Sequence, residues 1–144
     1  MSHPALDRLV SAGQLKVEPR NEAEMQRMLA LARTRLNDAG LAAVSLEGRF
    51  TSAYNAAHAA ALAALRWHGY RSENRYIVFQ CLTHTVDWPA QRWRVLDVAH
   101  RKRNLAEYEG YLEVEQSTLD ELRALVSELI SDVEALIAER AGGS

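Results

Sequence analysis

The stretch Ala56-Ala57-His58-Ala59-Ala60-Ala61-Leu62-Ala63-Ala64-Leu65 decides the fold of this 144-residue chain. Alanine has the highest helix propensity of the amino acids, and its small side chain lets a neighbouring helix approach closely. The stretch therefore predicts a central helix, which we place at residues 47–68. Gly69 follows it and is expected to end the helix in the left-handed conformation.

Helical periodicity recurs on both sides of this central helix, whereas strand signals are nearly absent. The expected helices are 5–12, 21–40, 47–68, 73–84 and 89–109, followed by a last helix that begins near residue 118. Asn21 can cap the free amides of the second helix. Pro89 suits the first turn of the fifth, and Gly110 is expected to end or kink it.

The last helix carries the clearest pattern. Thr118 and Glu121 have the spacing of a capping box. Apolar residues then recur at steps of three and four, at Leu119, Leu122, Val126, Leu129, Val133 and Leu136. This seam packs either within a bundle or against a partner chain. We therefore predict an all-α fold, an up-and-down bundle of four to five helices in a single domain 1–144. It comprises a short N-terminal helix and arm at 1–20 and a bundle core at 21–140.

Composition excludes several classes of protein. The chain is 48% hydrophobic, which is enough for one core, but no apolar run approaches the roughly 18 residues needed to cross a bilayer. The N-terminus lacks the features of a targeting sequence, so we expect a cytoplasmic protein with no membrane partner. The single cysteine, Cys81, cannot form an internal disulfide and is expected to be reduced and buried.

The net charge of −2 hides an asymmetry along the chain. Residues 66–103 contain eight basic and three acidic side chains, whereas residues 105–144 contain two basic and ten acidic ones. A basic middle segment can attract a phosphate-bearing ligand to one face of the molecule. The alternative is that both segments contribute ordinary solvated surfaces.

The helix at 89–109 holds the residues that could carry chemistry. Helical steps place Leu96, Ala99, Arg103 and Ala106 on one face. Arg103 is therefore expected to be buried, where it should meet a carboxylate, carbonyl groups or a phosphate ligand, because a buried guanidinium is costly without a partner. An adjacent row at steps of four holds His100, Asn104 and Tyr108. The alternative is a hydrogen-bond network that only positions the bundle.

The stretch Arg103-Asn104-Leu105-Ala106-Glu107-Tyr108, preceded by the helical stretch Ala53-Tyr54-Asn55-Ala56-Ala57-His58-Ala59-Ala60, resembles the HEPN domain superfamily. The resemblance covers roughly Leu41 to Glu139. HEPN domains are small helical bundles with an Arg-polar-x(3 to 5)-His motif on a late helix. The resemblance implies a homodimer in which the motif helices of two chains face one another. It also implies either a metal-independent endoribonuclease that acts as a toxin or defence effector, or a non-catalytic binding or scaffold protein.

The motif transfers only in part. Arg103 matches the motif arginine, and Asn104 matches the polar position after it. Tyr108 stands where a motif histidine would be, and a phenol is a poor general base for a ribose hydroxyl at neutral pH. Some relatives carry a tyrosine two residues beyond that histidine, but Gly110 holds that position here and Tyr111 lies one step late. This departure weighs against ordinary ribonuclease activity.

We therefore expect a HEPN-like protein that binds RNA or a nucleotide and is non-catalytic or altered in activity, in a toxin-antitoxin or defence context. The predicted ligand-binding residues are Arg103, Asn104, Tyr54 and Tyr111. The expected partners are a second copy of the chain, RNA or nucleotide, and a protein such as a cognate nucleotidyltransferase.

Two alternatives remain, and the sequence leaves open whether the protein is an enzyme. One is an active metal-independent endoribonuclease with His100, Arg103 and Tyr108 as catalytic residues. The other is a helical protein-interaction module without a nucleic-acid ligand, built on the Leu119–Leu136 seam.

A metal site is a separate hypothesis. Asp97 and His100 stand one turn apart on one helix, and His58 lies on another, so a bundle could bring a carboxylate and two imidazoles together. The spacing has little specificity, and a histidine among alanines is usually a core residue. We therefore predict no metal and no cofactor.

Overall fold

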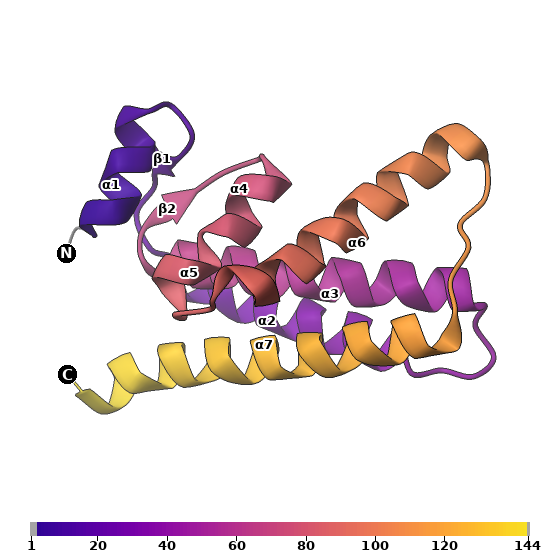
Figure 1. Cartoon of the computed structure of the whole chain (residues 1–144). Coiled ribbons are helices and arrows are strands. Elements are labelled where there is room, and N and C mark those ends of the chain that lie inside the picture. The colour runs from indigo at the N-terminus through magenta and orange to yellow at the C-terminus, as the bar shows by residue number, and fades with distance from the viewer. Residues whose placement is uncertain (1–2, 144) are drawn as a thin grey trace.

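A computed structural model describes residues 3–143, and most of them are helical (Figure 1). The elements in chain order are α1 (Pro4–Ser11), β1 (Lys16–Val17), α2 (Glu22–Asp38), α3 (Leu46–Trp67), β2 (Tyr70–Arg71), α4 (Arg75–Gln80), α5 (Leu82–Thr85), α6 (Ala90–Glu109) and α7 (Gln116–Gly143). The predicted all-α fold class is confirmed by this mostly helical chain. Among the described residues, no helix combines the length and the apolar character needed to span a bilayer.

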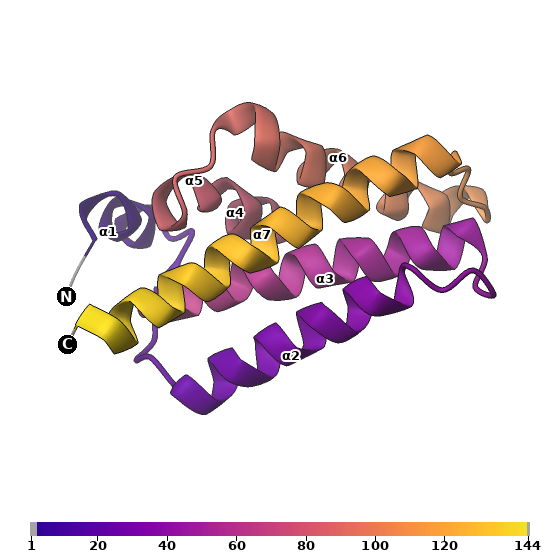
Figure 2. The ribbon, with the colours of Figure 1, turned by 90° about the horizontal axis from the view of Figure 1, so that it is seen from below.

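Helix α3 lies at the centre of the molecule. Helices α2 and α7 pack along one side of it, and α6 runs across the other (Figures 1 and 2). Eight of its alanines are buried, namely Ala53, Ala56, Ala57, Ala59, Ala60, Ala61, Ala63 and Ala64. Side chains of this size keep helix axes close together, so α3 can contact neighbours on more than one face.

Local signals set most of the helix boundaries. The Asn21 side chain accepts a 3.0 Å hydrogen bond from the Glu24 amide, which confirms the predicted cap of α2. Gly69 ends α3 with a φ of 90°, and Gly110 ends α6 with a φ of 81°. Residues with a Cβ rarely adopt this left-handed conformation, so glycine is favoured at both turns.

Three local predictions were wrong. The single helix expected at 73–84 is divided into α4 and α5, which meet at Cys81. Helix α7 begins at Gln116, so Thr118 lies inside the helix and does not cap it. Strands β1 and β2 pair antiparallel, with Lys16 opposite Arg71 and Val17 opposite Tyr70. Two residues per strand are too few to produce an alternating pattern in the sequence.

The apolar seam of α7 packs within the bundle. Leu119, Leu122, Val126, Leu129 and Val133 are all buried in the core cluster that also contains the α3 alanines. Trp88 belongs to the same core cluster, and its Nε1 donates a 2.7 Å hydrogen bond to the Asp132 carboxylate of α7. The part of the seam from Leu119 to Val133 therefore belongs to the core of this chain, and Leu136 is partly buried against it.

Cys81 is a free thiol and is buried, as expected. Burial raises its pKa to about 12, because the thiolate would lose its hydration. The thiol is therefore protonated and unreactive at neutral pH.

Arg66, near the end of α3, is a fully buried charge that joins several elements. Arg66 is 1% exposed, and its Nε donates a 2.5 Å hydrogen bond to Oε1 of Glu24 in α2. Its terminal nitrogens donate to the backbone carbonyls of Glu18 and Pro19 at 2.8 and 2.6 Å. Arg71 of β2 donates to the side-chain carboxylates of Glu18 and Glu24 at 2.7 Å each. One guanidinium therefore holds together α3, the start of α2 and the small sheet.

We expect Arg66→Met to lower the free energy of unfolding by roughly 3–5 kcal/mol, because it removes a buried charge that donates to the Glu18 and Pro19 carbonyls and to one partly buried oxygen of Glu24. The matched control is Arg33→Met, which removes an ion pair with Glu134 whose side chains are 50% and 40% exposed. The control should cost less than about 1 kcal/mol. Urea denaturation followed by circular dichroism measures both, and equal losses would contradict the central role of Arg66.

Candidate functional site

The candidate site surrounds the phenol of Tyr54, which α3 places in the interior. Tyr54 has no exposed surface, and its ring stacks on the imidazole of His100 from α6, with centroids 5.7 Å apart and ring planes inclined by 19°. The Tyr54 hydroxyl oxygen lies 2.9 Å from His100 Nδ1. The structure therefore brings together two predicted site residues that lie 46 positions apart in the sequence.

Arg75, the first residue of α4, supplies a cation that the sequence analysis missed. Its Nη1 donates a 2.9 Å hydrogen bond to the Tyr54 hydroxyl, and its Cζ lies 5.4 Å from the centroid of the Tyr54 ring. The neighbouring Asn74 side chain caps α4 by accepting from the Ile77 amide at 3.2 Å, which fixes where this helix begins. Burial raises the pKa of the Tyr54 phenol, and Arg75 partly opposes that rise. The phenol is therefore protonated at neutral pH.

Both ring nitrogens of His100 are engaged within the chain. Nδ1 meets the phenol, and Nε2 lies 3.2 Å from the side-chain nitrogen of Asn104, one turn further along α6. Both contacts are compatible with a neutral imidazole, whose tautomer sets which nitrogen donates. Burial lowers the pKa of His100; Asp97 opposes this shift, while Arg75 and Arg103 add to it. The site therefore favours a neutral, fixed imidazole.

Arg103 lies beside the same phenol but nearer the surface than expected. Its Cζ is 5.7 Å from the centroid of the Tyr54 ring, and 32% of its side chain is exposed. The prediction of a buried helix face is confirmed for the two preceding turns, where Leu96 and Ala99 are buried. Beyond them α6 diverges from α3 (Figure 1), so full burial of Arg103 was the wrong prediction. Its ion pair with the exposed Glu107 has a separation of 3.7 Å.

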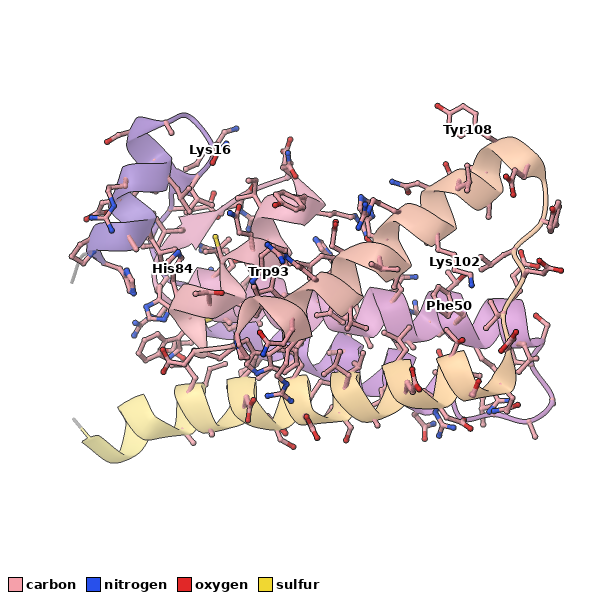
Figure 3. All side chains as sticks on the ribbon, in the orientation of Figure 1. Lys16, Phe50, His84, Trp93, Lys102 and Tyr108 are labelled. Atoms are coloured by element: carbon pink, nitrogen blue, oxygen red, sulfur yellow. The ribbon has the colours of Figure 1, made fainter. Side chains whose placement is uncertain are left out.

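Tyr108 and Tyr111 do not join this cluster. Tyr108 is 91% exposed and points away from the bundle at the far end of α6 (Figure 3), and Tyr111 is 59% exposed in the segment after that helix. Tyr108 belongs to the part of α6 that extends past the core, and Tyr111 follows the end of this helix. Within one chain, the site therefore consists of Tyr54, Arg75, His100, Arg103 and Asn104.

His58 and Asp97 lie near the cluster without forming a metal site. His58 packs edge-on against Phe79, with centroids 6.1 Å apart, and burial lowers its pKa to about 4, helped by the positive charge of Arg75 and by His100. Among the side chains that the structure describes, no three His, Cys, Asp or Glu residues are arranged to hold a metal ion. The metal hypothesis that combined Asp97, His100 and His58 therefore finds no support in this arrangement.

Comparisons of the chain with protein-family models, with curated proteins and with solved structures gave no match. The HEPN assignment therefore stays a prediction from the residues.

The charges around His100 predict opposite effects of two substitutions. Arg75→Gln removes a neighbouring positive charge and should raise the His100 pKa, whereas Asp97→Asn removes a negative charge and should lower it. In the wild type the pKa should lie below 6.5, so the contribution of His100 to stability is present above pH 6.5 and is lost as the pH falls through the folded-state pKa. NMR titration of the imidazole resonances measures all three proteins. Shifts of the same sign in both variants would contradict this electrostatic description.

Proposed function

We propose that this chain is a HEPN-like protein that binds RNA or a nucleotide through a phosphate group and does not cleave it, in a toxin-antitoxin or defence context. One observation carries the proposal. Two guanidinium groups, from Arg75 on α4 and Arg103 on α6, flank the phenol of Tyr54, while both nitrogens of His100 are already engaged.

Arg103 is suited to hold the phosphate. Its planar fork matches the geometry of phosphate oxygens, and nearly a third of its side chain is open to solvent. Its carboxylate partner Glu107 is 69% exposed and 3.7 Å away, so a phosphate can replace it at little cost. Asn104 is exposed on the next position of α6 and offers an amide beside the guanidinium. Arg75 adds a second positive charge behind the phenol.

The same geometry argues against cleavage. A general base must have a lone pair within reach of the ribose hydroxyl, but the His100 nitrogens meet the Tyr54 hydroxyl and the Asn104 side chain at 2.9 and 3.2 Å. Tyr108 is 91% exposed at the distal part of α6, away from the cluster of the same chain. Binding therefore accounts for these contacts better than catalysis does.

Arg103→Gln should weaken binding of single-stranded RNA roughly tenfold and should reduce the salt dependence by about one released counterion, since one phosphate contact is lost. The control is Arg33→Gln, which changes an arginine of α2 that pairs with Glu134. Fluorescence anisotropy across a range of salt concentrations measures both variants. Equal affinities of wild type and Arg103→Gln would contradict the proposed site.

Incubation of the protein with a pool of single-stranded RNA tests the catalytic alternative. We expect intact RNA after incubation with the purified protein. Specific cleavage that Arg103→Ala abolishes would replace the binding proposal with the endoribonuclease alternative.

We also propose that the chain forms a homodimer through α6, as the HEPN resemblance implies. Val95, Val98, Leu105 and Tyr108 are 45%, 52%, 56% and 91% exposed on this helix. A row of exposed apolar side chains is typical of an interaction surface, because water-exposed apolar area is costly. A second copy would cover this surface and bring the α6 helices of the two chains towards one another. A protein partner such as a nucleotidyltransferase is the alternative occupant.

The double substitution Val98→Asp/Leu105→Asp should convert the dimer into a monomer while leaving the helical circular dichroism spectrum intact, since both side chains are exposed in one chain. Leu41→Asp, at a residue 46% exposed in the segment after α2, is the control and should remain dimeric. Sedimentation velocity distinguishes the two states. A wild-type protein that is monomeric at high concentration would refute the dimer.

A further inference from the structure

A cluster of three histidines joins the N-terminal helix to the bundle, and the proposed function uses none of them. His3 precedes α1, His68 caps the C-terminus of α3, and His84 lies in α5. The ring of His3 meets both others edge-on, with centroids 5.6 Å from His68 and 5.9 Å from His84. Figure 3 shows His84 between the bundle and the end of α1. Three segments far apart in the sequence therefore meet through imidazole rings.

Two nitrogens of the cluster are sealed from solvent without a partner. His3 Nδ1 and His68 Nε2 have almost no accessible surface and no hydrogen bond in the described structure. An unpaired lone pair in such a place is tolerated better than an added N–H and its positive charge, because the charge would lose its hydration. In agreement, burial lowers the pKa of both His68 and His84.

The charged groups around the cluster also disfavour protonation. Arg8 of α1 acts on His84, and Arg20, in the segment before α2, acts on His68. Only the backbone of Thr85 opposes these effects on His68. The nearby Asp7 carboxylate of α1 accepts a 2.5 Å hydrogen bond from the Tyr70 hydroxyl, and that hydroxyl accepts from the His3 amide at 3.1 Å. A proton added to His68 or to His84 therefore meets one arginine and the ring of His3.

Other contacts also attach the N-terminal segment to the bundle. Helix α1 has eight residues and buries Leu6, and each strand of the β1–β2 ladder has two residues. The Glu18 amide adds one hydrogen bond to the Gly69 carbonyl at 2.9 Å. Leu9 and Val10 also pack against the core and Leu15 is buried in it, so a change in the histidine cluster acts on the docking of α1 together with these apolar contacts.

We propose that His3, His68 and His84 form a pH-sensitive clasp, in which the ring contacts of His3 with neutral His68 and His84 hold α1 and β1 on the bundle and protonation of His68 and His84 in mildly acidic solution weakens that docking. The sign follows from linkage. Histidines whose pKa is lowered in the folded state stabilise docking above pH 6.5, and that contribution is lost as the pH falls through the folded-state pKa. Glu24, which anchors α2 to Arg66, has a pKa lowered below 4.5, so it stays ionised throughout this range.

Hydrogen exchange of the full chain at pH 7.5 and pH 5.5, corrected for the intrinsic rates, tests the clasp. Peptides from α1 and β1 should lose protection by about tenfold or more at pH 5.5, since each unit of lowered pKa changes the docking equilibrium tenfold. Peptides from α3 and α7 should keep theirs. Unchanged protection of α1 in the wild type would overturn the proposal.

The matched variant is His3→Asn/His68→Asn/His84→Asn, which cannot titrate in this range. It should show the same α1 protection at both pH values, and a loss as large as in the wild type would overturn the proposal. If the variant already lacks α1 protection at pH 7.5, NMR titration of the wild type decides. The α1 amide shifts must then follow the His68 and His84 imidazole midpoints, and independent midpoints would overturn the clasp.

Discussion

The buried guanidinium of Arg66 is the interaction on which the arrangement of the helices depends. It donates to Glu24 at the start of α2 and to the backbone of the segment between β1 and α2, so it fixes how α2 leaves the small sheet. Arg71 shares the same carboxylates and holds β2. Because β2 leads directly into α4, this network also determines where Arg75 enters the candidate site.

Much of the positive charge in the middle of the sequence is neutralised by the fold. Arg66 and Arg71 pair with Glu18 and Glu24, and Arg92 pairs with Glu128 of α7. The number of basic residues between 66 and 103, eight, suggests one basic surface. Because of these ion pairs, they do not form one. The charge near Tyr54 comes instead from Arg75 and Arg103, which lie on two different helices. We therefore expect a small positively charged site beside Tyr54 and not a broad basic surface.

The candidate site and the histidine cluster use the same chemistry in opposite ways. Around Tyr54, both nitrogens of the His100 imidazole have hydrogen-bond partners, which makes His100 a fixed part of the binding site. Around His3, the neutral imidazoles leave two buried nitrogens without partners. The proposed binding site therefore uses an imidazole whose two nitrogens both have partners, whereas the proposed clasp depends on nitrogens that have none.

The sequence by itself determined the mostly helical class, the central alanine-rich helix and the ends of several helices, because propensity and capping act within a few residues. Asn21, Gly69 and Gly110 were identified for this reason. Tertiary structure alone decided the contacts between residues 21 to 67 positions apart, such as Arg75 with Tyr54 and His3 with Tyr70. It also decided the division of 73–84 into two helices and the exposure of Arg103. These features depend on how helices diverge and pack, and no local pattern of residues encodes that geometry.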